Sequence, residues 1–211
     1  MRKIIMIPIF LTISLLATYE SSVSRITPDV KQRMLKGNSW RKGCPVGLNN
    51  LRYLRVRHIN FSGQEVMGEL IVHKDVSDEV TKIFEALYDA GYPVRKMKLV
   101  SAYRGNDWHS IEADNTSAFN CRKATGSEKW SKHSYGKAID INPIENPYIA
   151  RSGRISHKAS LVYRKRVHQN STYADKALLL NHDKAVKIFK KYGWKWGGDW
   201  RGVKDYQHFS K

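Results

Sequence analysis

Cysteine is scarce in this sequence, with only Cys44 and Cys121 among 211 residues. Neither has a second cysteine at metal-ligand spacing, which argues against a zinc site built from thiolates. No cysteine follows the N-terminal apolar segment at a lipid-attachment position, so a lipid anchor is not predicted. The sequence also lacks internal repeats and low-complexity tracts.

Acidic residues are few as well. The chain has 19 Asp and Glu against 37 Lys and Arg, and its formal net charge is +18. Such an excess favours polyanionic partners, although solubility alone is an alternative explanation. The sequence has no motif of interleaved aromatic and basic residues, so nucleic acid is not a predicted partner.

Long apolar stretches are missing except at the N-terminus. Arg2 and Lys3 precede an apolar stretch at 4–17, and a polar segment of small residues ends at Ser24. This layout predicts a secretory signal peptide over residues 1–24. An uncleaved anchor is the alternative, but the stretch has 14 residues, and a spanning helix needs roughly 20.

Export to the periplasm, the extracellular space or the cell wall follows from that reading. No transmembrane span is expected in the mature chain. For an exported protein, the predicted polyanionic partner is an envelope component: peptidoglycan carboxylates, wall phosphates or lipid head groups. An oxidising compartment favours a disulfide between Cys44 and Cys121. Two buried free thiols are the alternative.

The residues after the signal peptide suffice for one domain with a real core. A basic leader is expected over 25–42, pinned by Trp40, and the domain itself over 43–211. The pattern predicts a hairpin of strands, a helix capped by Asp75 or Ser77, two further strands, a basic surface excursion and a last helix. The hairpin covers 53–61 and 69–73, and the helix stops at Gly91. The two further strands cover 97–103 and 137–141, the excursion 150–170 and the last helix 182–192.

Strands and helices do not alternate as regular βαβ units. The predicted class is therefore α+β: a single compact domain with a central, largely antiparallel sheet and flanking helices. The basic excursion has two readings, a solvated loop or a binding lip for an acidic wall polymer.

The residues that indicate chemistry are concentrated in two short stretches. His133 and Asp140 lie seven residues apart, and a loop that closes at Gly136 before entering a strand can bring both onto one metal ion. Imidazole nitrogen and carboxylate oxygen suit Zn²⁺, and a catalytic zinc needs a third protein ligand, which His208 offers. Asp205 lies three residues before His208 and is expected near the reacting water.

These stretches resemble a known family. Ser131, His133, Gly136, Ala138 and Asp140 match S-x-H-x-x-G-x-A-x-D, and Asp205 with His208 matches a closing acidic-x-x-His. Both are similar to the signature of the M15 zinc peptidases, which include D-alanyl-D-alanine carboxypeptidases, dipeptidases and L-alanyl-D-glutamate endolysins. Further segments between residues 40 and 210 resemble the exported, VanY-type branch. They are 43–45, 51–54, 115–122, 139–143 and 193–198.

The resemblance implies a Hedgehog and D,D-peptidase-like fold, a Zn²⁺ cofactor and a role for each matching residue. The zinc ligands would be His133, Asp140 and His208. Asp205 would be the general base, although many relatives carry Glu there, and second-shell support of a ligand is its alternative role.

The oxyanion of the reaction needs a cation or a hydrogen-bond donor. Arg104, in a Tyr-Arg element with Tyr103, and Arg122 are the two candidates, and an ordinary surface ion pair is the alternative for either. Contact with substrate is expected for Ser131, Tyr103 and Trp196. Trp200 is a further candidate for the cleft wall, and core packing is the alternative for both tryptophans.

The implied function is hydrolysis of peptidoglycan stem peptides. Two bonds compete, the terminal D-Ala-D-Ala bond of a carboxypeptidase and the L-Ala-D-Glu bond of an endopeptidase, and the sequence does not choose between them. A non-catalytic module of the same fold that binds cell wall is the alternative. The presence of Asp205 argues against it, because a binding module has no need of a general base.

Overall fold

The computed structural model describes residues 19–211. Most of the predicted signal peptide lies outside this range, but its last residues do not. Ser21–Arg25 forms strand β1, which pairs antiparallel with β2 (Leu51–Ile59). The predicted boundary after Ser24 therefore falls inside a strand of the domain. This strand was not predicted, because four of its five side chains are exposed and no apolar alternation results.

The longest strands form the predicted hairpin. β2 pairs antiparallel with β3 (Glu65–His73), and the sheet order is β1-β2-β3. Leu54 and Val56 on β2, with Leu70 and Val72 on β3, are fully buried or nearly so. Alternate residues of a strand point to one face, so these side chains cover one face of the sheet.

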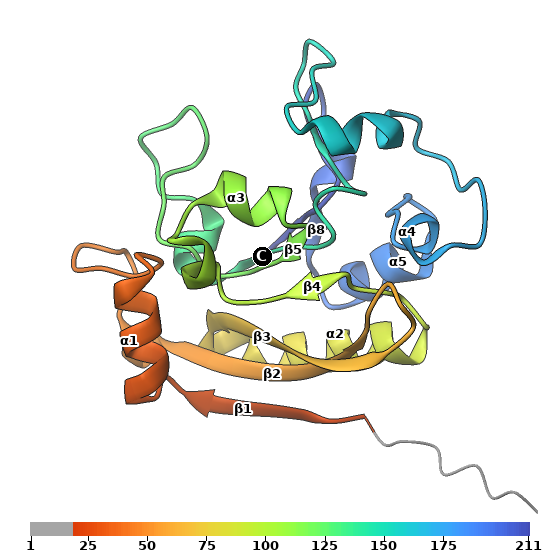
Figure 1. Ribbon diagram of the computed structural model, residues 1–211. Coiled ribbons are helices and arrows are strands. Elements are labelled where there is room, and N and C mark those ends of the chain that lie inside the picture. The colour runs from red at the N-terminus through yellow and green to blue at the C-terminus, as the bar shows by residue number, and fades with distance from the viewer. Residues whose placement is uncertain (1–18) are drawn as a thin grey trace, which may run out of the picture.

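Helix α2 (Ser77–Asp89) packs on that face, behind β2 and β3 in Figure 1. Its buried residues recur at helical spacing, at Val80, Ile83, Phe84 and Leu87, as the sequence predicted. These side chains join the sheet in the larger of two apolar clusters, where removal of apolar surface from water supplies most of the stabilisation.

The segment predicted as an irregular leader instead contains a helix, α1 (Pro28–Lys36), at one end of the sheet (Figure 1). Thr27 caps the helix and Pro28 lies in its first turn. Both are helix start signals, which the sequence prediction missed. Only Val30 and Met34 are buried, too few to produce a visible apolar period. Trp40 is held as expected, through a hydrogen bond from Nε1 to the Val46 carbonyl of 3.0 Å.

The remaining strands are short and form three small sheets. Their orders are β6-β10-β8, β4-β5 and β7-β9. They comprise β4 (Lys96–Met97), β5 (Asn115–Thr116), β6 (Ala138–Asp140), β7 (Tyr148–Ile149), β8 (Lys195–Trp196), β9 (Lys204–Asp205) and β10 (His208–Ser210). All pair antiparallel except β4 with β5. The structure is thus α+β with mainly antiparallel sheets, as predicted.

The strand predicted over 97–103 is much shorter than expected. After β4, the Asn115 side chain takes the place of a neighbouring strand, accepting from the Lys98 N–H at 2.8 Å and donating to the Lys98 carbonyl at 3.0 Å. The chain then turns through a 3₁₀ segment, Val100–Tyr103. A side chain from another element thus ends the strand, and no local pattern in the sequence signals that.

Three further helices complete the domain: α3 (Asp107–Glu112), α4 (Tyr173–Lys176) and α5 (Lys184–Lys191). α5 confirms the predicted last helix, with Val186 and Phe189 buried and Gly193 following at φ 79°. The excursion 150–170 holds a 3₁₀ segment, Lys158–Arg164. One of its arginines is not at the surface of a loop: Arg166 donates to the Glu145 and Leu179 carbonyls and to Asn146.

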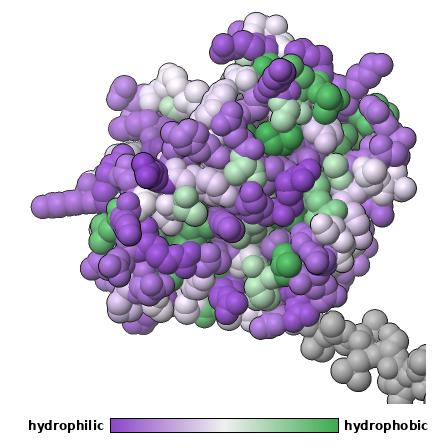
Figure 2. Space-filling view, viewed as in Figure 1, coloured by the Kyte–Doolittle hydropathy of each residue, from purple (hydrophilic) through white to green (hydrophobic). Residues whose placement is uncertain are grey.

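Cys44 and Cys121 form a disulfide, with Cα atoms 5.8 Å apart. It ties the segment after α1 to the chain that leads into the 131–140 motif. Figure 2 shows a mainly hydrophilic face, in keeping with the excess of Lys and Arg. Within residues 19–211, no helix has the length and apolar character needed to cross a membrane.

Candidate metal centre

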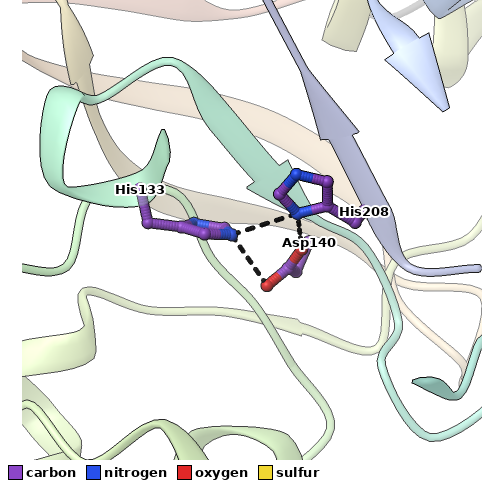
Figure 3. Close-up of side chains that lie close together, drawn as sticks. All are labelled: His133, Asp140 and His208. Atoms are coloured by element: carbon purple, nitrogen blue, oxygen red, sulfur yellow. Dashed lines mark hydrogen bonds and ion pairs between the residues drawn. The ribbon is translucent and has the colours of Figure 1, made fainter. Parts of the chain in front are cut away.

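Three side chains from distant parts of the chain converge on one point (Figure 3). His133 Nε2 lies 3.1 Å from Asp140 Oδ2, His208 Nδ1 lies 3.0 Å from Asp140 Oδ1, and the two ring nitrogens are 3.3 Å apart. All three residues are buried. Two imidazole nitrogens and a carboxylate oxygen at such spacing make a donor set for one metal ion, as the sequence predicted.

The register of two strands brings two of these residues together. β10 pairs with β6 so that His208 lies directly opposite Asp140, and directly opposed residues share one face of the sheet. On the next pair, Phe209 opposes Ile139, and both are fully buried in the core. A shift of one residue would move His208 to the other face.

Gly136 explains how His133 reaches the same point. It ends the 3₁₀ turn Lys132–Tyr135 in the left-handed region, at φ 65°. A Cβ at this position would lie 2.5 Å from the backbone nitrogen of His73. The Gly136 carbonyl accepts a hydrogen bond of 2.9 Å from that same nitrogen. The motif therefore needs glycine both for its turn and for close contact with β3.

The orientation of His133 is set on the side away from the cluster. Its Nδ1 donates to the Ala118 carbonyl over 2.6 Å, which leaves the lone pair of Nε2 directed at the cluster. Ser131 also acts locally: its Oγ accepts from the His133 backbone N–H at 3.3 Å and caps the turn. The structure thus shows Ser131 in a local role at the turn, and its substrate contact stays a prediction.

The charges of the cluster attract a cation. Burial opposes ionisation of Asp140, but its close contacts with His133 and His208 outweigh burial and hold the pKa of this carboxyl well below its usual range. Burial likewise disfavours the charged form of His208, yet its hydrogen bond to Asp140 and the charges of Asp140 and Asp205 raise its pKa. A proton thus competes with a metal ion for this nitrogen.

Asp205 lies beside the cluster without belonging to it. It sits on β9, opposite Tyr148 of β7, and its Oδ1 is buried without a hydrogen-bond partner. Burial and the neighbouring Asp140 charge raise the pKa of Asp205 to about 6. Gly197 packs against its backbone so closely that a Cβ there would overlap the Asp205 carbonyl. A carboxylate with such a pKa can accept a proton near neutral pH.

The two candidate arginines differ in their surroundings. Arg122 acts on the cluster, because its charge opposes protonation of His208. It is partly buried and pairs with Asp107 at 3.0 Å. Its backbone N–H donates to Ser134 Oγ at 2.9 Å, within the metal-binding motif. Arg104 is exposed at φ 56° and has no ion pair among the described residues. The choice between the two arginines stays a prediction, with the charge of Arg122 acting on His208.

The aromatic residues expected to contact substrate differ in how far they are buried. Trp196 is only 3% exposed, packs against Phe209, and donates from Nε1 to the Tyr206 carbonyl. Its place is the core, so the structure does not support the predicted substrate contact. Trp200 is 37% exposed, with its ring centroid 5.4 Å from that of His208, and suits a cleft wall. Tyr103 is partly buried, which raises the pKa of its hydroxyl.

Sequence reasoning missed two side chains of the site. Asp107 holds Arg122, but it lies 15 positions away at the start of α3, where an acidic residue is ordinary. Gln207 is buried between Asp205 and His208 in the chain, and its Oε1 has no partner. Its place inside the acidic-x-x-His motif was the available signal.

Comparison with known proteins agrees with the site. Residues 125–211 match the family model of D-alanyl-D-alanine carboxypeptidases of the M15 family. The resemblance predicted from the sequence is thus confirmed over this segment, which contains His133, Asp140, Asp205 and His208. The match supports a hydrolase of the peptidase class. Searches of curated proteins and of solved structures found no match.

Proposed function

We propose that this protein is a zinc metallopeptidase that hydrolyses peptidoglycan stem peptides. The observation that carries the proposal is the convergence of His133, Asp140 and His208, with Asp205 beside them. The donor set fits zinc, because two imidazoles and one carboxylate leave a tetrahedral ion one open position. The family match supports peptidoglycan as the substrate class.

Zinc, when bound, would polarise the scissile carbonyl and lower the pKa of the attacking water. The rest of the chemistry belongs to the chain. Asp205 accepts the proton of that water as it attacks the carbonyl carbon, and then returns the proton to the leaving amine. Its buried, unpartnered Oδ1 and its raised pKa, about 6, suit both transfers.

Arg122 stabilises the negative charge that develops on the carbonyl oxygen. The Asp107 carboxylate limits where its guanidinium can move, and Ser134 fixes its backbone. Such a preset cation is worth roughly 3 kcal/mol of barrier, as for one oxyanion donor. Arg104 and Tyr103 are assigned a smaller part, in substrate contact at the edge of the site.

Carboxypeptidase cleavage of the terminal D-Ala is the first choice of bond, supported by the description of the matched family. Cleavage between L-Ala and D-Glu is the second choice. Both substrates carry carboxylates and suit a chain with a net charge of +18. Action on the wall also requires export, which the disulfide supports, because disulfides persist mainly in oxidising compartments.

Digestion of purified peptidoglycan tests the proposal. We expect the protein to release D-Ala or a stem-peptide fragment, identified by mass spectrometry. A chelator should stop the release, and added Zn²⁺ should restore it. Release that persists in the chelator would overturn the zinc mechanism. Binding to the wall without any zinc-dependent product would instead favour a non-catalytic module.

A further inference from the structure

A large groove lies away from the metal centre. It has a volume of about 660 Å³ and runs between α1, the β2-β3 hairpin and the β4 segment. Volumes of about 300–1,000 Å³ are typical of ligand sites. The metal cluster contributes no residue to it. β4 pairs with β5, and Ser117, directly after β5, bridges to Asp140. The β4-β5 pair therefore lies between the groove and the cluster.

The groove is strongly cationic. Five basic side chains and two acidic ones line it. Two of the cations are already paired, Arg33 with Glu69 and Arg95 with Asp114. The other three have no ion pair among residues 19–211: Arg55, Lys96 and Lys98. They come from two walls, Arg55 from β2 and the lysines from the β4 segment. An anion in the groove would meet positive charge from both sides.

The two lysines share a direction. Lys96 and Lys98 are two residues apart in an extended segment, so their side chains point the same way, while Met97 between them is buried in the core. Lys98 is held at this point by the Asn115 side chain, which bonds both its N–H and its carbonyl. The backbone of Lys98 is thus anchored in this wall of the groove.

The groove also contains a buried polar group without a partner. His58 lines it and is only 4% exposed, and its Nδ1 has no hydrogen-bond partner. Burial of an unpaired polar atom costs free energy, so such atoms in folded proteins call for an explanation. Burial also lowers the pKa of His58, to about 4, and keeps the ring neutral near pH 7. A neutral ring can offer an N–H donor to a carboxylate.

The groove already binds one carboxylate, and this contact indicates which anion it suits. Arg33 holds Glu69 with two parallel hydrogen bonds of 2.8 and 2.7 Å, and the Tyr53 hydroxyl donates to the same carboxylate. Paired bonds of this kind match the planar carboxylate geometry. The free cations beside this pair offer equivalent charge to a carboxylate from outside.

We propose that this groove is a second binding site, which takes a carboxylate-bearing peptide segment of the wall polymer while the metal centre cuts elsewhere. The identity of the polymer rests on the proposed function, whereas the preference for carboxylates rests on the groove itself. The site would hold the insoluble polymer near the enzyme. The contribution of the groove to polymer binding should weaken as salt is added, because exposed charges are screened over about 10 Å at 0.1 M ionic strength.

The test measures binding alone, with chelator present, so that its outcome does not depend on catalysis. Sedimentation with purified, phosphate-free peptidoglycan compares the native chain with a groove variant, R55Q/K96Q/K98Q. The matched control is K184Q/K187Q/K191Q, which removes the same charge from exposed positions of α5. We expect about tenfold weaker binding for the groove variant and nearly native binding for the control. Equal loss in both variants would mean that only net charge matters, and would overturn the site.

Two measurements on the native chain keep the proposal testable if the groove variant does not fold. Peptidoglycan whose carboxyl groups have been converted to amides should bind about tenfold more weakly, and unchanged binding would overturn the carboxylate assignment. Titration with triglutamate should shift the NMR signals of the His58 ring, and the shift should saturate at a lower concentration of triglutamate than of inorganic phosphate. The reverse order would assign the groove to phosphate. Absence of a shift with both probes would overturn the proposed binding site.

Discussion

The two larger sheets of the molecule differ in how they are built. β2 and β3 are nine residues each, with one face buried against a helix of 13 residues. The sheet that carries Asp140 and His208 has strands of two or three residues. The first holds itself together by many repeated contacts, the second by a few contacts between distant segments. Asp140 and His208 lie in the second sheet. The other two groups of the site lie next to it, His133 in the turn that precedes β6 and Asp205 on β9.

Removal of a metal-binding side chain should show the largest difference between the two sheets. His208→Ala removes one donor of the cluster and should abolish zinc binding, lowering activity on stem peptides at least about a thousandfold. The long sheet should remain folded, because its core does not include His208. Zinc content and circular dichroism measure the two effects.

The control for this change is Ser210→Ala, two residues along the same strand. It should keep zinc and activity. An H208A protein that still holds zinc at native stoichiometry would contradict the assigned ligand set.

Removal of the base should leave the metal in place. Asp205→Asn should lower kcat by about 10²–10⁴-fold, while zinc content stays native, because Asp205 is not a ligand. In the native chain, activity should rise as pH passes about 6, where the Asp205 carboxyl ionises. The residual activity of the variant should lack this rise. Asp199→Asn, at an exposed carboxylate, is the control, and equal losses would contradict the general-base role.

The disulfide ties the segment after α1 to the chain that leads into the metal-binding motif, so its loss should lower both stability and activity. Cys44 and Cys121 are separated by 77 positions, so the bond restricts a long loop of the unfolded chain. The double change to Ser should lower the free energy of unfolding by about 4 kcal/mol, measured with urea. Activity should fall as well, because Arg122 follows Cys121 directly. Unchanged stability would show that the loop is already ordered without the bond.

His58 should affect acid stability in the long sheet alone. Its folded-state pKa, about 4, lies below the usual 6.5, so the native state favours the neutral ring. The resulting stability is present above pH 6.5 and is lost as pH falls toward 4, by up to roughly 3 kcal/mol. His58→Gln should flatten this part of the profile in urea unfolding at stepped pH. A variant profile parallel to the native one would contradict the assignment.

Elements with a strong local pattern were predictable. The hairpin and α2 show period-two and helical spacing over long stretches, and α5 adds Gly193 at its end. α1 and β1 were missed, because their buried residues are few. The prediction of a strand over 97–103 was wrong: β4 ends at Met97, and the side chain of the distant Asn115 bonds the backbone of the next residue, Lys98.

The site divides in the same way. The residues that could hold a metal were predictable from the sequence, because His133, Gly136 and Asp140 lie in one dense motif and His208 lies in a second, shorter one. That their donor atoms meet, that the charge of Arg122 acts on His208, and that Trp196 lies in the core follow from the fold. Strand register and side-chain burial depend on contacts between segments far apart in the chain, and no local pattern encodes them.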